Sequence, residues 1–246
     1  MPHPDWISHR GLCERATENT AEAFRAALEA GFTHLETDLR ITADDHLVLA
    51  HDEDLSRVAG TPLKVTEATR LELEQIRLRG GEPLLFFDQW LEEFGRYRWI
   101  LDIKPEQGQR TLARLFDHWR NEARELLDER ARFLFWDSTQ QQLLRTHRPE
   151  IQCMAPMPEC RRAGLTCLMG LPALAGIRPG ASYSLPPSLK GRRLLTPRMV
   201  NRYQQRDARV LAFLPETDEE VDWALEAGVD EVLSNHRPHN HRPRLS

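Results

Sequence analysis

The feature that most constrains the fold of this chain is a structural unit that occurs near its start and again near its end. Residues 29–38 and 226–235 share one layout: the end of a helix, a Glu-Ala-Gly triplet and a short apolar run typical of a strand. Glycine suits the left-handed conformation that often ends a helix. Repeated helix–glycine–strand units indicate parallel strands joined by right-handed crossovers.

The rest of the chain continues this alternation. Strands are expected at residues 6–9, 32–39, 99–103, 132–136, 151–155, 181–185, 210–214 and 231–233, with another short apolar run at 47–50. Helices are expected at 109–128, 138–146, 197–206 and 217–227, and an early helix capped by Thr17 or Asn19 should end at Gly31. About eight parallel strands favour a (β/α)8 TIM barrel over an open doubly wound sheet.

The length of the chain and the lack of a linker segment within it predict a single domain over residues 1–246. Residues 53–97 fit no simple strand–helix unit. Two short helices, near 66–78 and 87–95, are expected there, in a small insertion between the second and third barrel strands. Residues 237–246 are rich in His, Arg and Pro and are predicted to form a flexible tail.

Composition narrows the class of function. The net charge of −5 argues against binding to nucleic acid through bulk positive charge. The four cysteines form no C-x-x-C pair, so neither a disulfide framework nor a zinc site is expected. The N-terminus lacks the pattern of a secretory signal, and the longest apolar stretch, 164–177, is too short to span a bilayer. These patterns predict a cytoplasmic protein without a transmembrane segment, and they leave the oligomeric state open.

Acidic residues stand at the ends of two expected strands. Glu36 and Asp38 are two apart, so on a strand they point to the same side. At the carboxyl end of a barrel strand they would lie where barrel enzymes keep their sites. Adjacent carboxylates need a cation or protons to neutralise them, and a hard ion such as Mg²⁺ or Ca²⁺ is the simplest neutraliser. Asp102 and Lys104 share a face in the same way and would add one oxygen ligand and one fixed cation.

Two histidines also end apolar runs. A lone histidine is more often structural, but His9 and His51 lie at neighbouring strand ends beside the carboxylate pair. Histidine can give or take a proton near neutral pH, so two of them around a substrate can act as an acid–base pair. Arg10 has the fork geometry that binds phosphate or carboxylate. Glycine at position 11 would permit an unusual turn or a close backbone approach.

At these residues the chain resembles the glycerophosphodiester phosphodiesterase family. The resemblance is dense over residues 6–60, and weaker pieces follow. The matching segments are His9-Arg10-Gly11, Glu18-Asn19-Thr20, Glu36-x-Asp38, Asp44-Asp45, His51-Asp52 followed by Leu55 and Arg57, and Asp102-x-Lys104. The resemblance implies a (β/α)8 barrel that hydrolyses glycerophosphodiesters, which are small molecules, to sn-glycerol 3-phosphate and an alcohol, with one divalent metal.

The resemblance also implies roles for individual residues. The metal, Mg²⁺ or Ca²⁺ with Mn²⁺ as another option, would be held by Glu36, Asp38 and Asp102. The general acid and base would be His9 and His51, in an order that the sequence leaves open. The phosphate would be bound by Arg10 and Lys104. The loop beside His9 would be shaped by Glu18 and Asn19, with Glu18 close to the metal.

The chain also departs from the family pattern. The third ligand is usually Glu, and Asp102-x-Lys104 is similar to the pattern of the sphingomyelinase D-type phospholipases. A late Trp-Thr-Val-Asn-like segment is replaced by Ala212-Phe213-Leu214-Pro215, and a Thr-Asp pair near the last strand by Ser234-Asn235. These changes fall on the specificity side of the site more than on its metal–histidine centre.

Three alternatives to this function follow from the residues. The first is a lysophospholipase D-like or related lipid phosphodiesterase on the same barrel. The run Leu84-Leu85-Phe86-Phe87 could line its entrance, although core packing explains that run better. The second is a binding protein without turnover. The third is another metallohydrolase that uses the H-x-H pair His239-Asn240-His241, which is better explained as part of a solvated tail.

Overall fold

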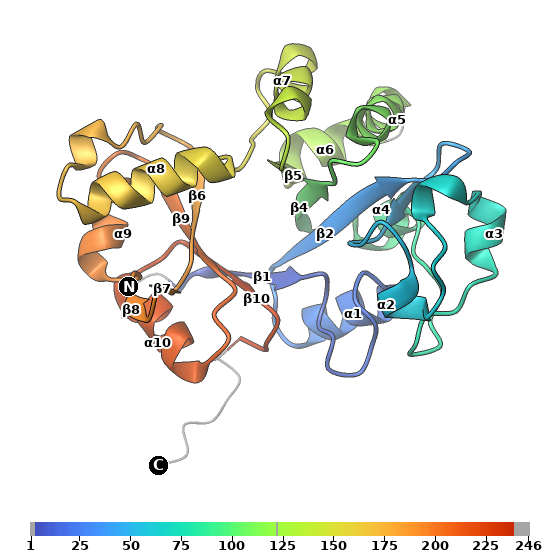
Figure 1. The fold of residues 1–246 in the computed structure, drawn as a ribbon, viewed down its shortest axis with the longest axis horizontal. Helices are drawn as coiled ribbons and strands as arrows, with labels where there is room; N and C mark the ends of the chain where they lie inside the picture. The colour runs from blue at the N-terminus through green and yellow to red at the C-terminus, as the bar shows by residue number, and fades with distance from the viewer. Residues whose placement is uncertain (1–2, 122, 239–246) are drawn as a thin grey trace.

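A curled parallel sheet forms the centre of the computed structural model, which describes residues 3–121 and 123–238 (Figure 1). Its strands pair in the order β5-β4-β2-β1-β10-β9-β6. They are β1 (Asp5–His9), β2 (His34–Ile41), β4 (Arg98–Ile103), β5 (Ala131–Phe135), β6 (Ser182–Leu185), β9 (Arg209–Phe213) and β10 (Glu231–Ser234). Parallel bridges from Phe133 to Cys153 and from Met154 to Ser182 join the two edges. The predicted (β/α)8 barrel is therefore confirmed, although the strand expected at 151–155 is reduced to these bridges.

Helices follow the strands, as the alternation predicted. They are α1 (Ala21–Glu29), α4 (Phe87–Phe94), α5 (Gly108–Asn121), α6 (Arg124–Arg130), α7 (Ser138–His147), α8 (Met157–Leu168), α9 (Pro197–Gln204) and α10 (Asp218–Ala227). The early helix is capped by Thr20, whose hydroxyl accepts from the Ala23 N–H, and not by Thr17 or Asn19. Gly31 and Gly228 both have positive φ after their helices, as the repeated unit requires.

After β4 the structure departs from the predicted helices at two places. Residues 109–128 form two helices, because the Ala123 N–H bonds to the His118 carbonyl five residues back and so breaks the regular ladder. Helix α8 was not predicted. Pro158 occupies its first turn, where proline is tolerated, and its buried face consists only of small side chains, Cys160, Ala163 and Cys167, which give a weak apolar period.

The segment between β2 and β4 builds a small second core. It contains the short strand β3 (Leu47–Leu49), antiparallel to β2, then α2 (Ser56–Ala59), the 3₁₀ turn η1 (Val65–Glu67), α3 (Arg70–Glu74) and α4. The helix expected at 66–78 is shorter than predicted, because Thr69 and Glu72 form a capping box that starts a new helix. The run from Leu84 to Phe87 is buried, as core packing predicts.

Alternation along the strands divides the barrel interior into layers. Ile7, Ile100, Met154, Leu211 and Leu233 form an apolar middle layer. At the amino-terminal end of the strands, a buried ion pair joins Glu231 to two arginines, Arg132 and Arg209. Polar side chains lie at the carboxyl ends of the strands, on the other side of the apolar layer.

Two short elements, the hairpin of β7 (Ser188–Leu189) and β8 (Arg192–Arg193) and the turn η2 (Pro172–Leu174), flank β6. Over the residues that the structure describes, we find no helix of the length and apolar character needed to cross a bilayer.

Candidate active site

Three buried carboxylates meet at the carboxyl ends of β2 and β4. Glu36, Asp38 and Asp102 each offer an oxygen, and these oxygens lie within 4.8 Å of one another. Asp38 and Asp102 are direct partners in the register of the two strands, which explains their proximity. We call these three residues the acid trio. The proximity that the two-residue spacing predicted is confirmed.

Two cations contact the acid trio. Lys104 Nζ lies 2.7 Å from Oδ1 of Asp38 and 2.6 Å from Oδ2 of Asp102. Arg10 Nε lies 3.1 Å from the other oxygen of Asp38. Burial alone would raise the pKa of Asp38, but Lys104 and Arg10 outweigh it and lower the pKa. Asp38 is therefore the trio member that stays ionised most easily.

Glu36 and Asp102 experience the opposite balance. Burial, reinforced by Asp38 and Asp102, holds the pKa of Glu36 well above its ordinary value. Burial also raises the pKa of Asp102, and the Asp38 charge adds to this against the effect of Lys104. Three carboxylates facing two cations leave a surplus negative charge in a buried place. A hard divalent cation fits this set, because its ligands are oxygens and it would remove the surplus.

The loop after β1 is fixed against the acid trio. Asn19 Nδ2 donates to Oδ2 of Asp38 at 2.8 Å, and its own Oδ1 accepts from the Thr37 hydroxyl at 2.8 Å. Its backbone N–H donates to the Arg10 carbonyl at 2.9 Å. Gly11 has φ +87°, and a Cβ there would lie 2.6 Å from atoms of Ala23. The unusual turn expected at this glycine is therefore present.

Both predicted histidines line one cavity of ≈ 170 Å³. His9 Nδ1 lies 2.7 Å from Oδ1 of Asn235, and burial together with Arg10 lowers the pKa of His9. His51 Nδ1 lies 2.7 Å from Oδ1 of Asp52. The same cavity is also lined by Arg10, Glu36, Asp102 and Lys104. The structure therefore brings together the histidines, the cations and two of the acids in a single space.

Glu18 lies with the arginines instead of the acid trio. Its carboxylate is 3.2 Å from Arg10 Nη1 and 2.6 Å from Arg57 Nη2. Arg57 Nε in turn lies 2.6 Å from Asp52, the partner of His51. Glu18 thus connects the loop that follows His9 to the one that follows His51.

Sequence reasoning missed three residues of this site. The sequence marks Asn235 only as part of the Ser234-Asn235 departure from the family pattern and indicates no contact with His9. Arg40 donates from Nε and Nη2 to the His51 carbonyl at 3.1 and 2.7 Å, a contact with no local sequence signal. Trp136 Nε1 donates to Asp102 at 2.9 Å, although the side chain is 55% exposed. A tryptophan at the end of the strand expected at 132–136 was the one available signal.

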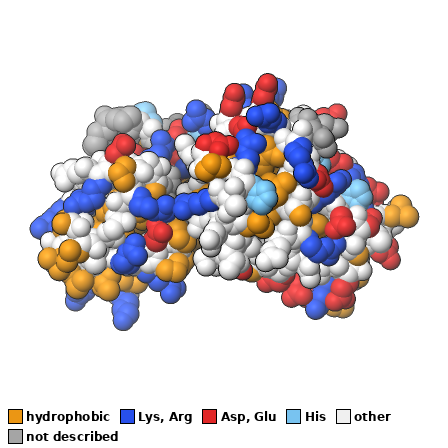
Figure 2. All heavy atoms as spheres, turned by 90° about the horizontal axis from the view of Figure 1, so that it is seen from above, with side chains coloured by type: hydrophobic (Ala, Val, Ile, Leu, Met, Phe, Trp, Pro, Cys, Tyr) orange, Lys and Arg blue, Asp and Glu red, His pale blue; other side chains and the backbone are white. Residues whose placement is uncertain are grey.

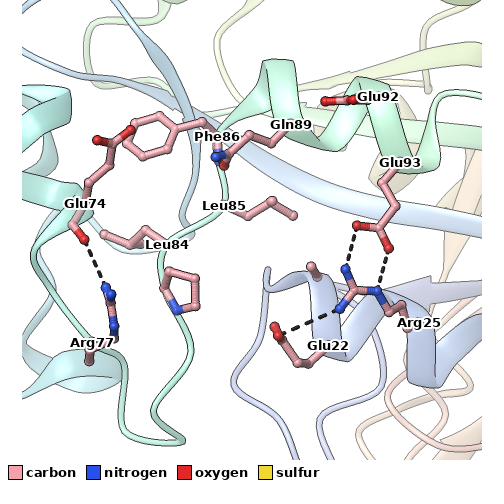
Figure 3. Close-up of a pocket in the computed structure, with 12 residues that line it drawn as sticks. Glu22, Arg25, Glu74, Arg77, Leu84, Leu85, Phe86, Gln89, Glu92 and Glu93 are labelled. Atoms are coloured by element: carbon pink, nitrogen blue, oxygen red, sulfur yellow. Dashed lines mark hydrogen bonds and ion pairs between the residues drawn. The ribbon is translucent and has the colours of Figure 1, made fainter.

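A larger cavity of ≈ 610 Å³ lies elsewhere, between α1, α4 and the segment before α4 (Figure 3). Both arginines that line it are already bound within it: Arg25 binds Glu93 through two nitrogens, and Arg77 donates to the Glu74 carbonyl. None of the residues predicted for the site lines it. His239 and His241 of the H-x-H pair fall outside the described residues.

Comparisons with known proteins agree with this geometry. The model of the Glycerophosphoryl diester phosphodiesterase family matches residues 9–238. The solved structure of the glycerophosphoryl diester phosphodiesterase domain of a Mycobacterium tuberculosis protein superposes with a TM-score of 0.81 at 15% identity, covering 96% of this chain and 97% of that one. A glycerophosphodiester phosphodiesterase from Agrobacterium tumefaciens gives 0.74 at 20% identity, covering 96% and 98%. At these identities the likeness shows the fold.

Two curated relatives are similar over a shorter stretch. Lysophospholipase D GDPD1 of Homo sapiens is 40% identical over 67 residues, which are 27% of this chain and 21% of that protein. A glycerophosphodiester phosphodiesterase of Caldanaerobacter subterraneus is 37% identical over 70 residues, 28% of this chain and 29% of that protein. The matched part of the chain thus spans less than a third of either relative.

Proposed function

We propose that this chain, which belongs to the glycerophosphoryl diester phosphodiesterase family, hydrolyses glycerophosphodiesters to sn-glycerol 3-phosphate and an alcohol. The observation that carries the proposal is the shared cavity. Two histidines, two cations and two members of a buried acid trio face one space. Phosphodiester cleavage needs charge neutralisation at the phosphate and proton transfer at two oxygens, and these residue types supply both.

The acid trio would hold one divalent cation, Mg²⁺ or Ca²⁺, with Mn²⁺ as a further option. When bound, such an ion supplies Lewis-acid polarisation of a phosphate oxygen. Arg10 and Lys104 would bind the remaining phosphate oxygens, since both line the cavity and carry N–H donors. Asn19 would keep Asp38 in place through its 2.8 Å hydrogen bond, and Glu18 would hold Arg10 and Arg57 in position.

The contacts of the two histidines favour different roles. A carboxamide oxygen only accepts hydrogen bonds, so His9 Nδ1 carries the hydrogen and Nε2 keeps a lone pair. Asn235 Nδ2 donates to Glu216, which supports this orientation of the amide. With its pKa lowered by burial and by Arg10, His9 is neutral near pH 7 and suits a general base. His51 Nδ1 contacts the Asp52 carboxylate, which holds the ring in place and leaves His51 for the general-acid role.

The first experiment measures release of sn-glycerol 3-phosphate from a panel of glycerophosphodiesters, with Mg²⁺, Ca²⁺ or Mn²⁺ added and with EDTA as control. Metal-dependent release is expected, and His9→Ala and His51→Ala should each lower it by roughly 10²–10⁴-fold. Near-normal turnover in both variants would refute the mechanism. Metal binding without hydrolysis of any diester would favour the binding-protein alternative.

A substrate with 4-nitrophenol as its leaving group separates the two histidine roles. That alcohol leaves without help from a general acid, so His51→Ala should recover most of its activity on it. His9→Ala should stay impaired, because the nucleophile still needs a base. The reverse pattern would exchange the two roles.

A second candidate function is lysophospholipase D-like cleavage of lipid diesters. One side of the cavity is apolar, lined by Leu134, Trp136, Leu211, Phe213 and Leu214. Trp136 and Phe213 remain partly exposed at its entrance, where an acyl chain could contact them. Hydrolysis of lysophosphatidylcholine in preference to glycerophosphocholine would select this function.

The predicted cytoplasmic location stays a prediction.

A further inference from the structure

We propose that the face formed by α8, η2 and α9 binds the surface of an anionic phospholipid membrane. This surface, the α8–α9 face, is separate from the active site and does not depend on the proposed function. Its apolar members are Leu165, Leu168, Met169, Leu171 and Leu174, which are 48–69% exposed. Its basic members are Arg161, Arg162, Arg198, Arg202 and Arg206.

Helix α8 carries its larger apolar side chains on its exposed face. Its buried face carries Cys160, Ala163 and Cys167, which are small. Its outward face carries Arg161, Leu165 and Leu168, spaced four and three residues apart and all exposed. Scattered exposed leucines are normal on protein surfaces, but contiguous ones mark interaction sites. Directly after the helix, Met169, Leu171 and Leu174 are exposed as well.

The charge of this region opposes that of the whole chain. Residues 157–209 contain ten Lys or Arg and two acidic residues, although the chain has a net charge of −5. One of the two acids, Glu159, pairs with Arg178. Among the described residues, no carboxylate lies within ion-pair distance of Arg161, Arg162, Arg198, Arg202 or Arg206. The arginines therefore present uncompensated positive charge around the apolar row.

The apolar and basic side chains belong to one surface. Arg202 of α9 donates to the Cys167 carbonyl near the end of α8, and Arg162 donates to the Ala175 carbonyl just after η2. Figure 2 shows basic and hydrophobic side chains gathered over the half of the molecule that carries α8 and α9, with most acidic side chains over the other half. Beyond α9 the surface charge changes from positive to negative, because α10 begins with Asp218, Glu219 and Glu220.

This chemistry fits a membrane better than another copy of the chain. A symmetric dimer through this face would bring its uncompensated arginines against their own copies, which is unfavourable. An anionic lipid surface accepts both groups at once: the leucines enter the boundary between headgroups and acyl chains, while the arginines stay with the phosphates. An acidic protein would match the charge but would not by itself require exposed leucines.

The position of the face leaves the active site open to water. Residues 169–181 connect the end of α8 to the start of β6, so Met169, Leu171 and Leu174 lie toward the amino-terminal ends of the strands. The cavity with His9 and His51 lies at the carboxyl ends. A membrane that Met169, Leu171 and Leu174 enter would therefore contact the end of the barrel opposite the cavity, and the cavity would stay accessible to dissolved substrates.

The test is cosedimentation of the full chain with vesicles of phosphatidylcholine alone or mixed with phosphatidylglycerol. Binding is expected only with phosphatidylglycerol and should weaken as salt is raised. Arg161→Glu and Arg198→Glu should each weaken it by at least about fivefold, given the worth of one basic residue near such a surface. Leu168→Ser should weaken it roughly tenfold or more through lost apolar burial.

Matched controls lie on the opposite half of the chain. Leu71→Ser removes a leucine that is 70% exposed, and Arg79→Glu reverses an exposed arginine. Both should bind vesicles like the wild type, and thermal melts should show that all variants fold. Absence of binding to phosphatidylglycerol vesicles, or equal loss in the controls, would overturn the proposal.

Two further outcomes would also overturn it. If sedimentation equilibrium without lipid shows a dimer that Leu168→Ser dissociates, this face is a contact between copies. Binding to soluble polyglutamate as strong as binding to vesicles, and unaffected by Leu168→Ser, would indicate an acidic polypeptide as the partner.

Discussion

The ammonium group of Lys104 lies 2.6 Å from Oδ2 of Asp102, and both side chains are almost fully buried. The same nitrogen is 2.7 Å from Asp38. Lys104 therefore contacts two of the three carboxylates proposed to hold a cation, while it also lines the cavity proposed for the phosphate. It would stabilise the acid trio without metal and compete with a bound metal for the same oxygens.

Lys104→Met separates these two effects. Removing a positive charge next to Asp38 and Asp102 should raise the affinity for Mg²⁺ or Ca²⁺ several-fold. It should also lower kcat by about 10²–10³-fold through loss of a phosphate donor. Calorimetric metal titration and steady-state kinetics measure the two. Lys64→Met is the control, because Lys64 is half exposed and pairs with Glu53 away from the site. Weaker metal binding in the variant would mean that Lys104 orders the ligands and does not compete.

Glu36→Gln should change how stability depends on pH. Burial with Asp38 and Asp102 raises the pKa of Glu36 well above 4.5 in the folded chain. The folded state then binds a proton more tightly than the unfolded state, so stability falls as pH rises from about 4.5 toward the raised value. Each pH unit of that difference is worth about 1.4 kcal/mol. The metal-free variant should therefore become more stable than the wild type as pH rises.

Urea unfolding in EDTA between about pH 5 and pH 8 measures this difference. Adding Mg²⁺ or Ca²⁺ should stabilise the wild type and leave Glu36→Gln nearly unchanged, because the glutamine lacks a charged ligand. Parallel pH profiles for the two proteins in EDTA would show that Glu36 is already ionised without metal.

Arg40 should act on turnover through His51. Its guanidinium donates twice to the His51 carbonyl and pairs with Glu106 at 2.8 Å, and it does not line the cavity. Arg40→Met should lower kcat by roughly 10–10²-fold, as expected for a small displacement of a reacting group. KM and metal affinity should change little, and Arg40→Lys should recover part of the loss. A rise in KM with unchanged kcat would indicate a substrate contact instead.

The barrel and the centre of the site could be predicted because both depend on local patterns in the sequence: alternating strands and helices, and side chains spaced two apart on a strand. Glu36 with Asp38 and Asp102 with Lys104 are spaced two apart on strands, so their shared face follows from the strand alone. His9 and Glu36 are partners in the register of β1 and β2. Parallel pairing then brings these strand ends together without further information.

The remaining contacts could not be predicted because they depend on long-range packing. Asn235 reaches His9 across 226 positions of sequence, and Arg40 reaches the His51 carbonyl through the antiparallel pairing of β2 with β3. Helix α8 could not be predicted from its apolar period, because its buried face carries small residues and its exposed face carries leucines. The strand expected at 151–155 has the right composition, but only Cys153 and Met154 form bridges.

The ion pair at the other end of the barrel gives the last prediction. Glu231 is 1% exposed and lies 2.9 Å from both Arg132 and Arg209. Glu231→Gln keeps the shape but leaves two arginines without their shared carboxylate. Breaking a buried pair from one side typically costs about 3–5 kcal/mol, so unfolding in urea should show a loss near the lower limit, since Arg209 is half exposed. Turnover well below the melting temperature should be unchanged, because the apolar layer of Ile7 and Leu233 separates this pair from the site. A loss of activity without a loss of stability would mean that the pair acts on the site across that layer.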